Sequence, residues 1–142
     1  MRCQDIMKRP VVFCREPETL QAASHKMRDA NIGFLPICSA EGRVVGVLTD
    51  RDIALRAVAD GLDTKATSIA RVMTRQVVSC RKEHDLRFAE QLMVRNQKSR
   101  ILVVDEDAKP MGVISLSDIA KHDRVFAAET MRQVSSREIQ TK

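Results

Sequence analysis

The chain has 142 residues, 44% of them hydrophobic and 30% charged, which is typical of one soluble globular domain or two small halves sharing a core and excludes a disordered chain. The net charge is +5, but aromatic residues make up only 3% and the basic residues are scattered among 19 acids, so we do not expect nucleic-acid binding. No apolar run approaches the roughly 18 residues of a membrane helix, and MRCQDIMKRP lacks the apolar core of a secretory signal, so we expect a cytoplasmic protein.

The first half of the chain predicts a strand, a helix, a hairpin and a second helix, in that order. A short β run at 11–14 precedes a helix at about 19–30, whose apolar residues recur at helical spacing. Two apolar runs at 34–38 and 44–48 flank the turn-forming SAEG and predict a β-hairpin. A second helix is expected to begin at Asp50.

The second half predicts the same elements again. They are a β run at 77–80, a helix at 85–96, a hairpin of 101–104 and 111–114 around DEDAKP, and a helix from Ser117. After about residue 123 we expect a further helical segment that ends frayed, since VSSREIQTK has no apolar face. The expected boundaries are a first domain at 5–61, a linker at 62–72, a second domain at 73–126 and a tail at 127–142.

The two halves are copies of one unit. A shift of 66 residues places 7–54 on 73–120 without a gap, and 14 of these 48 positions are identical. Each unit reads β-α-β-β-α, which predicts an α+β fold with α/β-like character, because strands that are apolar on both sides need helices to cover them. A unit of this size is marginal alone, so we expect the two to pack their sheets together around a pseudo-twofold axis.

Each copy carries a hydroxyl residue followed three positions later by an aspartate, as Thr49 and Asp52 and as Ser115 and Asp118. One interpretation is a capping box that stabilises the start of a helix by about 1 kcal/mol and does nothing more. The other is a ligand site, because a hydroxyl at a helix N-terminus suits a phosphate and an aspartate one turn on can accept hydrogen bonds from a ribose. The local pattern leaves both open.

Cysteine and histidine residues indicate neither a metal site nor catalysis. The cysteines at 3, 14, 38 and 80 form no C-x-x-C pair and the three histidines are isolated, so we expect free thiols and no metal. Cys14 and Cys80 are repeat equivalents, which leaves a redox pair as an alternative. The methionines at 7, 27, 73 and 93 are expected in the core. No nucleophile and base arrangement or phosphate-binding glycine loop is present in the sequence, so we do not expect an enzyme.

The gapless duplication, the junctions GVLTDRDIA and GVISLSDIA and the run IGFLPI at 32–37 resemble a tandem pair of CBS domains, named for cystathionine β-synthase. The resemblance covers about residues 5–125 and is strongest to small stand-alone bacterial proteins. It implies a regulatory sensor that needs no cofactor and binds AMP, ADP, ATP or S-adenosylmethionine in the cleft between the two domains. It also implies a homodimer, and a signal passed to an unknown protein partner or through oligomerisation.

The resemblance also implies roles for particular residues. The hydroxyls of Thr49 and Ser115 would touch phosphate and the carboxylates of Asp52 and Asp118 the ribose, while Arg100 lies where many family members aim an arginine at phosphate. The adenine would rest on the apolar residues and backbone of the first strand and of the segment leading into the second. These positions are Val11, Val12, Ile32, Phe34, Leu35 and Pro36 in the first copy, and Val77, Val78, Ile101 and Leu102 in the second.

The two sites differ, and we favour the first because Arg51 adds charge beside Thr49 where the second copy has Ser117. Many CBS pairs bind no nucleotide, so a structural or protein-interaction module with empty sites is the alternative function.

Overall fold

The computed structural model describes residues 1–140, and the side chains of all of them except 126 and 136–140. The chain divides into two compact units. The central unit comprises residues 12–77, and the terminal unit joins residues 1–11 to the part of the chain from residue 78 onward. The first eleven residues therefore pack with the second repeat, whereas the continuous range expected for the first domain was 5–61.

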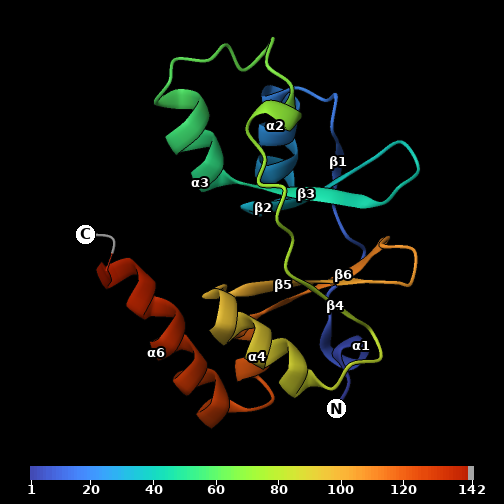
Figure 1. Cartoon of the computed structure of the whole chain (residues 1–142), viewed down its shortest axis with the longest axis vertical. Coiled ribbons are helices and arrows are strands. Elements are labelled where there is room, and N and C mark those ends of the chain that lie inside the picture. The colour runs from blue at the N-terminus through green and yellow to red at the C-terminus, as the bar shows by residue number, and fades with distance from the viewer. Residues whose placement is uncertain (141–142) are drawn as a thin grey trace. The chain divides into compact units, whose positions relative to one another are not determined.

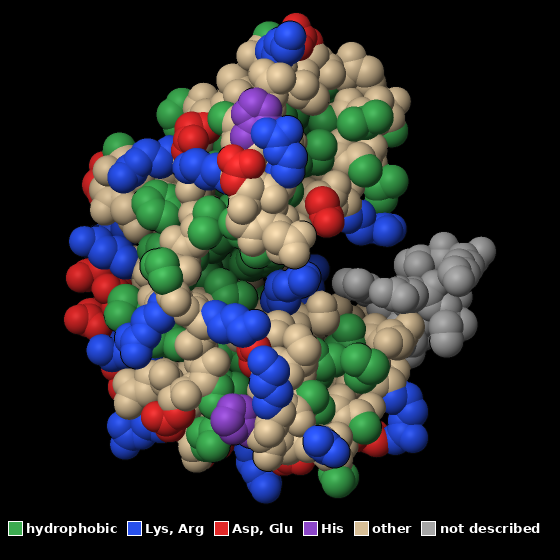
Figure 2. Space-filling view, turned by 180° about the vertical axis from the view of Figure 1, so that it is seen from behind, with side chains coloured by type: hydrophobic (Ala, Val, Ile, Leu, Met, Phe, Trp, Pro, Cys, Tyr) green, Lys and Arg blue, Asp and Glu red, His purple; other side chains and the backbone are tan. Residues whose placement is uncertain are grey.

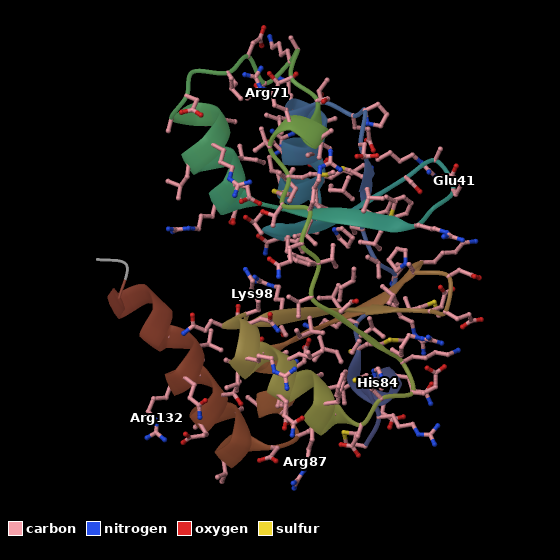
Figure 3. The ribbon with its side chains drawn as sticks, viewed as in Figure 1. Glu41, Arg71, His84, Arg87, Lys98 and Arg132 are labelled. Carbon is pink, nitrogen blue, oxygen red and sulfur yellow. The ribbon has the colours of Figure 1, made fainter. Side chains whose placement is uncertain are left out.

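The central unit contains one three-stranded sheet in the order β1-β2-β3 (Figure 1). Strands β1 and β2 are parallel, and β2 and β3 form an antiparallel hairpin whose turn carries Glu41 (Figure 3). Its elements are β1 Cys14–Arg15, α2 Leu20–Ala30, β2 Phe34–Cys38, β3 Val44–Thr49, α3 Asp50–Asp52, the π-helical η1 Ile53–Val58 and the 3-10 helix η2 Ile69–Arg71.

The terminal unit repeats this sheet as β4-β5-β6, again with one parallel and one antiparallel pair. Helices α4 and α6 lie side by side on one face of the sheet (Figure 1). Its elements are α1 Cys3–Ile6, β4 Ser79–Arg81, α4 Leu86–Asn96, β5 Arg100–Val104, β6 Pro110–Ser115, α5 Leu116–Ala120 and α6 Arg124–Gln140.

Helices α2 and α4 begin and end by the same local chemistry. The Thr19 hydroxyl accepts a hydrogen bond from the N–H of Ala22, and the Asp85 carboxylate accepts one from the N–H of Arg87. Both helices end on a residue in the left-handed conformation, Asn31 with φ 55° and Gln97 with φ 53°. The repeat thus specifies two helices of 11 residues each.

Each unit has its own hydrophobic core, and the four repeat-matched methionines belong to these cores as predicted. The central core includes Leu20, Ala23, Met27, Leu35, Ile37, Leu48, Ile69 and Met73. The terminal core includes Cys3, Met7, Cys80, Met93, Ile101, Val103, Ile114 and Ile119. Side chains at alternate positions of β2 and β5 point into these cores because successive residues of a strand face opposite sides of the sheet.

Short segments at the start of each repeat, before its first strand, pair with the edge strand of a sheet. The backbones of Lys8 and Val113 exchange two hydrogen bonds of 2.9 and 3.1 Å, and Thr74 and Val47 exchange two of 2.9 Å. Glycines at the matching positions of β3 and β6 permit this approach. A Cβ atom on Gly112 would lie 2.7 Å from the Met7 side chain, and one on Gly46 would lie 2.9 Å from the Thr74 carbonyl oxygen.

Three sequence expectations need correction. The first strands begin later than expected, at Cys14 and Ser79 instead of residues 11 and 77. Helix α5 begins at Leu116, one residue before the predicted Ser117. The tail is helical through Gln140 instead of frayed, because α6 packs on α4 and α5 and buries Ala127, Thr130 and Val134. Residues 141–142 lie outside the described residues. None of the helices in the described part of the chain is long and apolar enough to cross a membrane.

Candidate functional site

Thr49 and Asp52 form a reciprocal pair where β3 becomes a helix. The N–H of Asp52 donates to Thr49 Oγ1 at 3.0 Å, and the N–H of Thr49 donates to Asp52 Oδ2 at 3.0 Å. The adjoining N–H of Asp50 donates to the Gly33 carbonyl at 3.0 Å. The pair is therefore a capping box, and it leaves the hydroxyl proton of Thr49 and Oδ1 of Asp52 outside the reciprocal bonds.

Ser115 and Asp118 form the same pair between β6 and α5. The two reciprocal hydrogen bonds are 2.9 and 3.1 Å long, and the N–H of Leu116 donates to the Ser99 carbonyl at 2.9 Å. Here the hydroxyl has a further neighbour, because Ser115 Oγ lies 2.9 Å from Ser117 Oγ. The structure thus confirms a capping box in both copies, and this finding does not exclude a ligand beside it.

Lys8 forms an ion pair with Asp118 that has no lysine counterpart at Asp52 among the described residues. Its Nζ lies 3.2 Å from Asp118 Oδ1, and the Asp118 side chain is only 6% exposed. Burial works to raise the pKa of Asp118, but hydrogen bonds from Ser115 and the ammonium of Lys8 outweigh it and lower the pKa below its ordinary value. Both oxygens of Asp118 are therefore in use within the terminal unit.

The central unit places a threonine, Thr74, at the repeat position of Lys8. The basic group nearest Asp52 comes instead from its own helix, where Arg56 Nε lies 4.0 Å from Asp52 Oδ1 and Arg56 Nη1 donates to the Val72 carbonyl at 3.0 Å. The Asp52 side chain is 15% exposed. Sequence reasoning missed Lys8, although the matched Met7 and Met73 beside these positions were a signal that could have found it.

The structure brings some of the proposed ligand-contacting residues next to the boxes. Across each hairpin, Phe34 pairs with Thr49 and Arg100 pairs with Ser115 in the strand register, so both lie at the junctions. Arg51 is exposed beside Thr49, and Ile32 is 37% exposed in the turn before β2. Thr49 thus has an aromatic partner across its hairpin, and Ser115 has a basic one.

Other proposed residues lie elsewhere. The side chains of Leu35 and Ile101 are fully buried in the cores of their units, so only their backbones remain to meet a ligand. Pro36 and Leu102 are also buried, on positions that alternate with these core residues. The valine pairs at 11–12 and 77–78 precede β1 and β4. In each pair, one valine belongs to the terminal unit and the other to the central unit.

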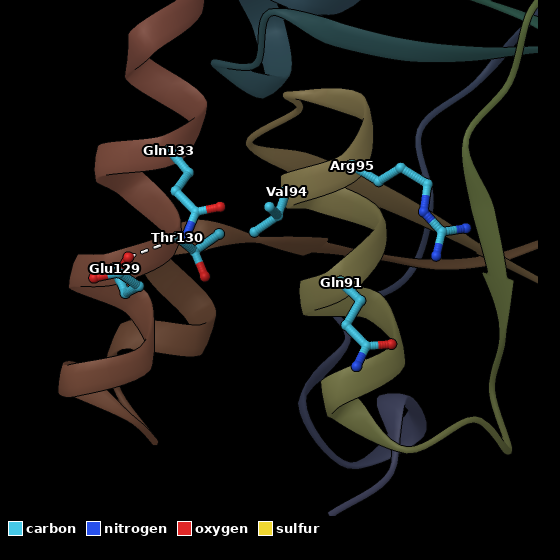
Figure 4. Close-up of a pocket in the computed structure, with 6 residues that line it drawn as sticks. All are labelled: Gln91, Val94, Arg95, Glu129, Thr130 and Gln133. Carbon is cyan, nitrogen blue, oxygen red and sulfur yellow. Dashed lines mark hydrogen bonds between the residues drawn. The ribbon is translucent and has the colours of Figure 1, made fainter.

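A groove of about 360 Å³ lies between α4 and α6, and no residue of either box lines it (Figure 4). The hydroxyl oxygen of Thr130 is buried there and has no hydrogen-bond partner in the described part of the chain. The groove is lined by Gln91, Val94, Arg95, Glu129, Thr130 and Gln133.

A second hollow, of about 180 Å³, surrounds a buried carboxylate on α4. Glu90 is 2% exposed, and its Oε2 has no hydrogen-bond partner among the described residues. Burial and the negative charge of Asp123 raise the pKa of Glu90 to about 7, with Arg87 opposing and Asp85 adding to the shift. The sequence pattern missed this residue because a carboxylate is not expected on a buried helix face, although Glu90 lies one turn from both Leu86 and Met93 on the buried face of α4.

The charged surface is mixed. On the face shown in Figure 2, Lys and Arg side chains alternate with acidic ones and form no continuous basic stripe. Mixed charge of this kind is not the basic patch or stripe that is typical of nucleic-acid binding.

The family model of the CBS domain matches residues 3–58 and 69–124. Hypoxic response protein 1 of Mycobacterium tuberculosis is 34% identical over 119 residues, which cover 84% of this chain and 82% of that protein. A crystal structure of Hypoxic Response Protein I with two coordinated zinc ions has a TM-score of 0.78 at 32% identity and covers 87% of this chain and 99% of that one. In the described part of this chain, no group of three or more His, Cys, Asp or Glu is placed to hold a metal ion.

A second solved structure carries adenosine compounds. The CBS domain pair of protein MJ0100, in complex with 5'-methylthioadenosine and S-adenosyl-L-methionine, has a TM-score of 0.76 at 26% identity and covers 91% of this chain and 98% of that one. Together with the matched family model, these similarities confirm the predicted resemblance and the α+β fold class.

Lys8→Met is expected to lower the free energy of unfolding by about 1 kcal/mol near neutral pH, because it removes a partner of the buried Asp118 carboxylate. The folded pKa of Asp118 lies below its ordinary value of 3.8, so this contribution is present above pH 3.8 and is lost as the pH falls through the folded pKa. Urea unfolding between pH 2.5 and 8 measures it. The exposed Lys65→Met is the control, and a wild-type advantage that does not shrink in acid would contradict the assignment.

Glu90→Gln is expected to stabilise the protein relative to wild type at pH 8 but not at pH 4.5. Because the folded pKa is raised to about 7, wild type loses stability as the pH rises from 4.5 through 7, and Gln removes that loss. The difference should reach about 1 to 3 kcal/mol in urea unfolding. Asp60→Asn, at an exposed position, should show no such trend. A difference between Glu90→Gln and wild type that stays constant with pH would show that Glu90 titrates normally.

Proposed function

The chain belongs to the CBS-domain family, and on that premise we propose that it is a regulatory module that binds an adenosine-containing small molecule. The candidate ligands are AMP, ADP, ATP and S-adenosylmethionine. The observation that carries the proposal is the pair of hydroxyl and carboxylate groups at both strand–helix junctions, held in place by their own backbone hydrogen bonds. The adenosine compounds bound by the MJ0100 pair support the ligand class.

The first junction is the better site. Thr49 Oγ1 already accepts the Asp52 N–H, and its own proton is free to be donated to a phosphate or carboxylate oxygen. Asp52 Oδ1 is available to accept a hydrogen bond from a ribose hydroxyl, since its only basic neighbour in the described residues is Arg56 at 4.0 Å. Exposed Arg51 adds positive charge beside Thr49.

The second junction offers less. A ribose at Asp118 would have to displace Lys8 from Oδ1, and a phosphate at Ser115 would compete with the Ser117 hydroxyl. Arg100, exposed and paired in register with Ser115, is the group that would favour a phosphate there. We therefore propose that Asp52 carries the tighter site.

Ligand binding would act by shifting a conformational or oligomeric equilibrium, and only to the extent that the ligand prefers one state. A homodimer is the assembly we propose, with a second protein as recipient of the signal. The alternative function is a protein-interaction module whose capping boxes only stabilise helices. The reciprocal bonds of both capping boxes, which by themselves account for the hydroxyl and the aspartate as helix caps, are the observation that favours it.

A thermal melt panel separates these functions. One of the four ligands, at about 100 times its Kd, is expected to raise the Tm by roughly 6 °C, which corresponds to about 2.7 kcal/mol. Asp52→Ala should abolish most of this shift and Asp118→Ala should retain it. No shift with any of the four at millimolar concentration would favour the interaction module. A shift that Asp118→Ala alone removes would reverse the order of the two sites.

A further inference from the structure

The N-terminal segment, residues 1–9, is fastened to the terminal unit by backbone hydrogen bonds along its length. The N–H of Cys3 donates to the His84 carbonyl at 2.9 Å and that of Gln4 to the Lys82 carbonyl at 3.0 Å. His84 lies beside α1 (Figure 3). At its other end the segment pairs with Val113 and places Lys8 on Asp118. An interaction that fixes this segment in place therefore also fixes Lys8 beside Asp118.

Two thiols meet where the segment crosses β4. The Sγ atoms of Cys3 and Cys80 lie 3.5 Å apart, and the side chains are 0% and 2% exposed. A disulfide requires the sulfur atoms to approach by about 1.5 Å more, to about 2.05 Å. The residues are 77 positions apart in sequence, so a bond between them would close a long loop. The sequence comparison had suggested Cys14 as the partner of Cys80, and the structure instead gives Cys80 the thiol of Cys3.

The hydrogen bond between the two thiols shifts their pKa values in opposite directions. Cys80 donates to Cys3, so this bond lowers the pKa of Cys3 even though burial opposes it, and the same bond together with burial raises the pKa of Cys80. Cys3 is the thiol more readily ionised, and the thiolate is the nucleophile in sulfur oxidation. Burial raises the pKa of Cys14 and Cys38, which makes both less reactive.

We propose that Cys3 and Cys80 form a reversible disulfide that locks the N-terminal segment, and with it Lys8, onto the terminal unit. A hydroperoxide is the oxidant. The Cys3 thiolate attacks one peroxide oxygen, the O–O bond breaks, and the products are a Cys3 sulfenic acid and, after protonation, water. The Cys80 sulfur then attacks the sulfenic sulfur, the S–O bond breaks, and a second water leaves with the Cys80 proton. Two thiols and one hydrogen peroxide thus become one disulfide and two waters.

The reverse step needs an external thiol. A dithiol attacks one sulfur of the bond through a mixed disulfide, releases both cysteines as thiols and is itself oxidised. Because Cys3 and Cys80 are buried, entry of either reagent requires local opening of the segment. Such opening is common for short terminal segments and should set the rate of both steps.

The experiment treats the full chain with a small molar excess of hydrogen peroxide and determines its intact mass and its non-reduced peptide map. We expect a loss of about 2 Da, a cross-linked peptide joining residues 3 and 80, and recovery of the original mass with dithiothreitol. Cys3→Ala and Cys80→Ala should each abolish the loss, whereas the matched controls Cys14→Ala and Cys38→Ala should retain it. The non-reduced peptide map of the wild-type protein tests the proposal even if one of the variants does not fold.

Two further readouts follow the locking itself. The oxidised protein should melt at least about 5 °C higher than the reduced one. Amide exchange of Lys8 should slow by about tenfold or more. Oxygen added to the cysteines without any loss of 2 Da, a cross-link that joins a different pair, or an oxidised protein with unchanged Tm and exchange would overturn the proposal. None of these measurements depends on a nucleotide, so the proposal stands or falls separately from the proposed function.

Discussion

The reciprocal hydrogen bonds between a hydroxyl residue and the aspartate three positions later organise both halves of this protein. Each pair ends a buried strand, begins a helix and fixes a hydroxyl and a carboxylate on one side of the junction. The neighbouring carbonyls of Gly33 and Ser99 tie the loop before each hairpin to the same turn. A stabilising element and a candidate ligand site are thus made from the same atoms, and the capping function and the binding function are compatible.

The two junctions differ in the side chain that the neighbouring edge segment, carrying Lys8 or Thr74, brings to the aspartate. Lys8 and Thr74 pair with Val113 and Val47 in the same way through their backbones, yet only Lys8 carries a charge to the nearby aspartate. The Lys8 side chain therefore occupies Oδ1 of Asp118, whereas no equivalent lysine contacts Asp52 in the described part of the chain. Since Lys8 belongs to the segment that also carries Cys3, the state of that segment bears directly on Asp118.

The repeat made much of this predictable. The gapless shift located both helices, both hairpins and the two hydroxyl and aspartate pairs, because identical residues at identical spacing have the same local energetics. It could not locate Lys8 against Asp118 or Cys3 against Cys80, since these are contacts between residues 110 and 77 positions apart that depend on how the chain folds back. It gave no sign that Glu90 is buried, and the length of α6 was underestimated, because packing between helices decides which side chains are buried and how far a helix continues. The proposed roles of the ligand-contacting residues, and the domain limits, remain predictions.

Isothermal titration calorimetry with the ligand that gives the largest shift in Tm tests the central claim, that Lys8 blocks the ribose position at the second junction. Wild type is predicted to show one tight site, and Lys8→Met to show a second site in addition, because Asp118 Oδ1 is then free for a ribose. Adding Asp118→Ala to Lys8→Met should remove the second site again. Two equal sites in wild type, or no gain of a site in Lys8→Met, would contradict the account.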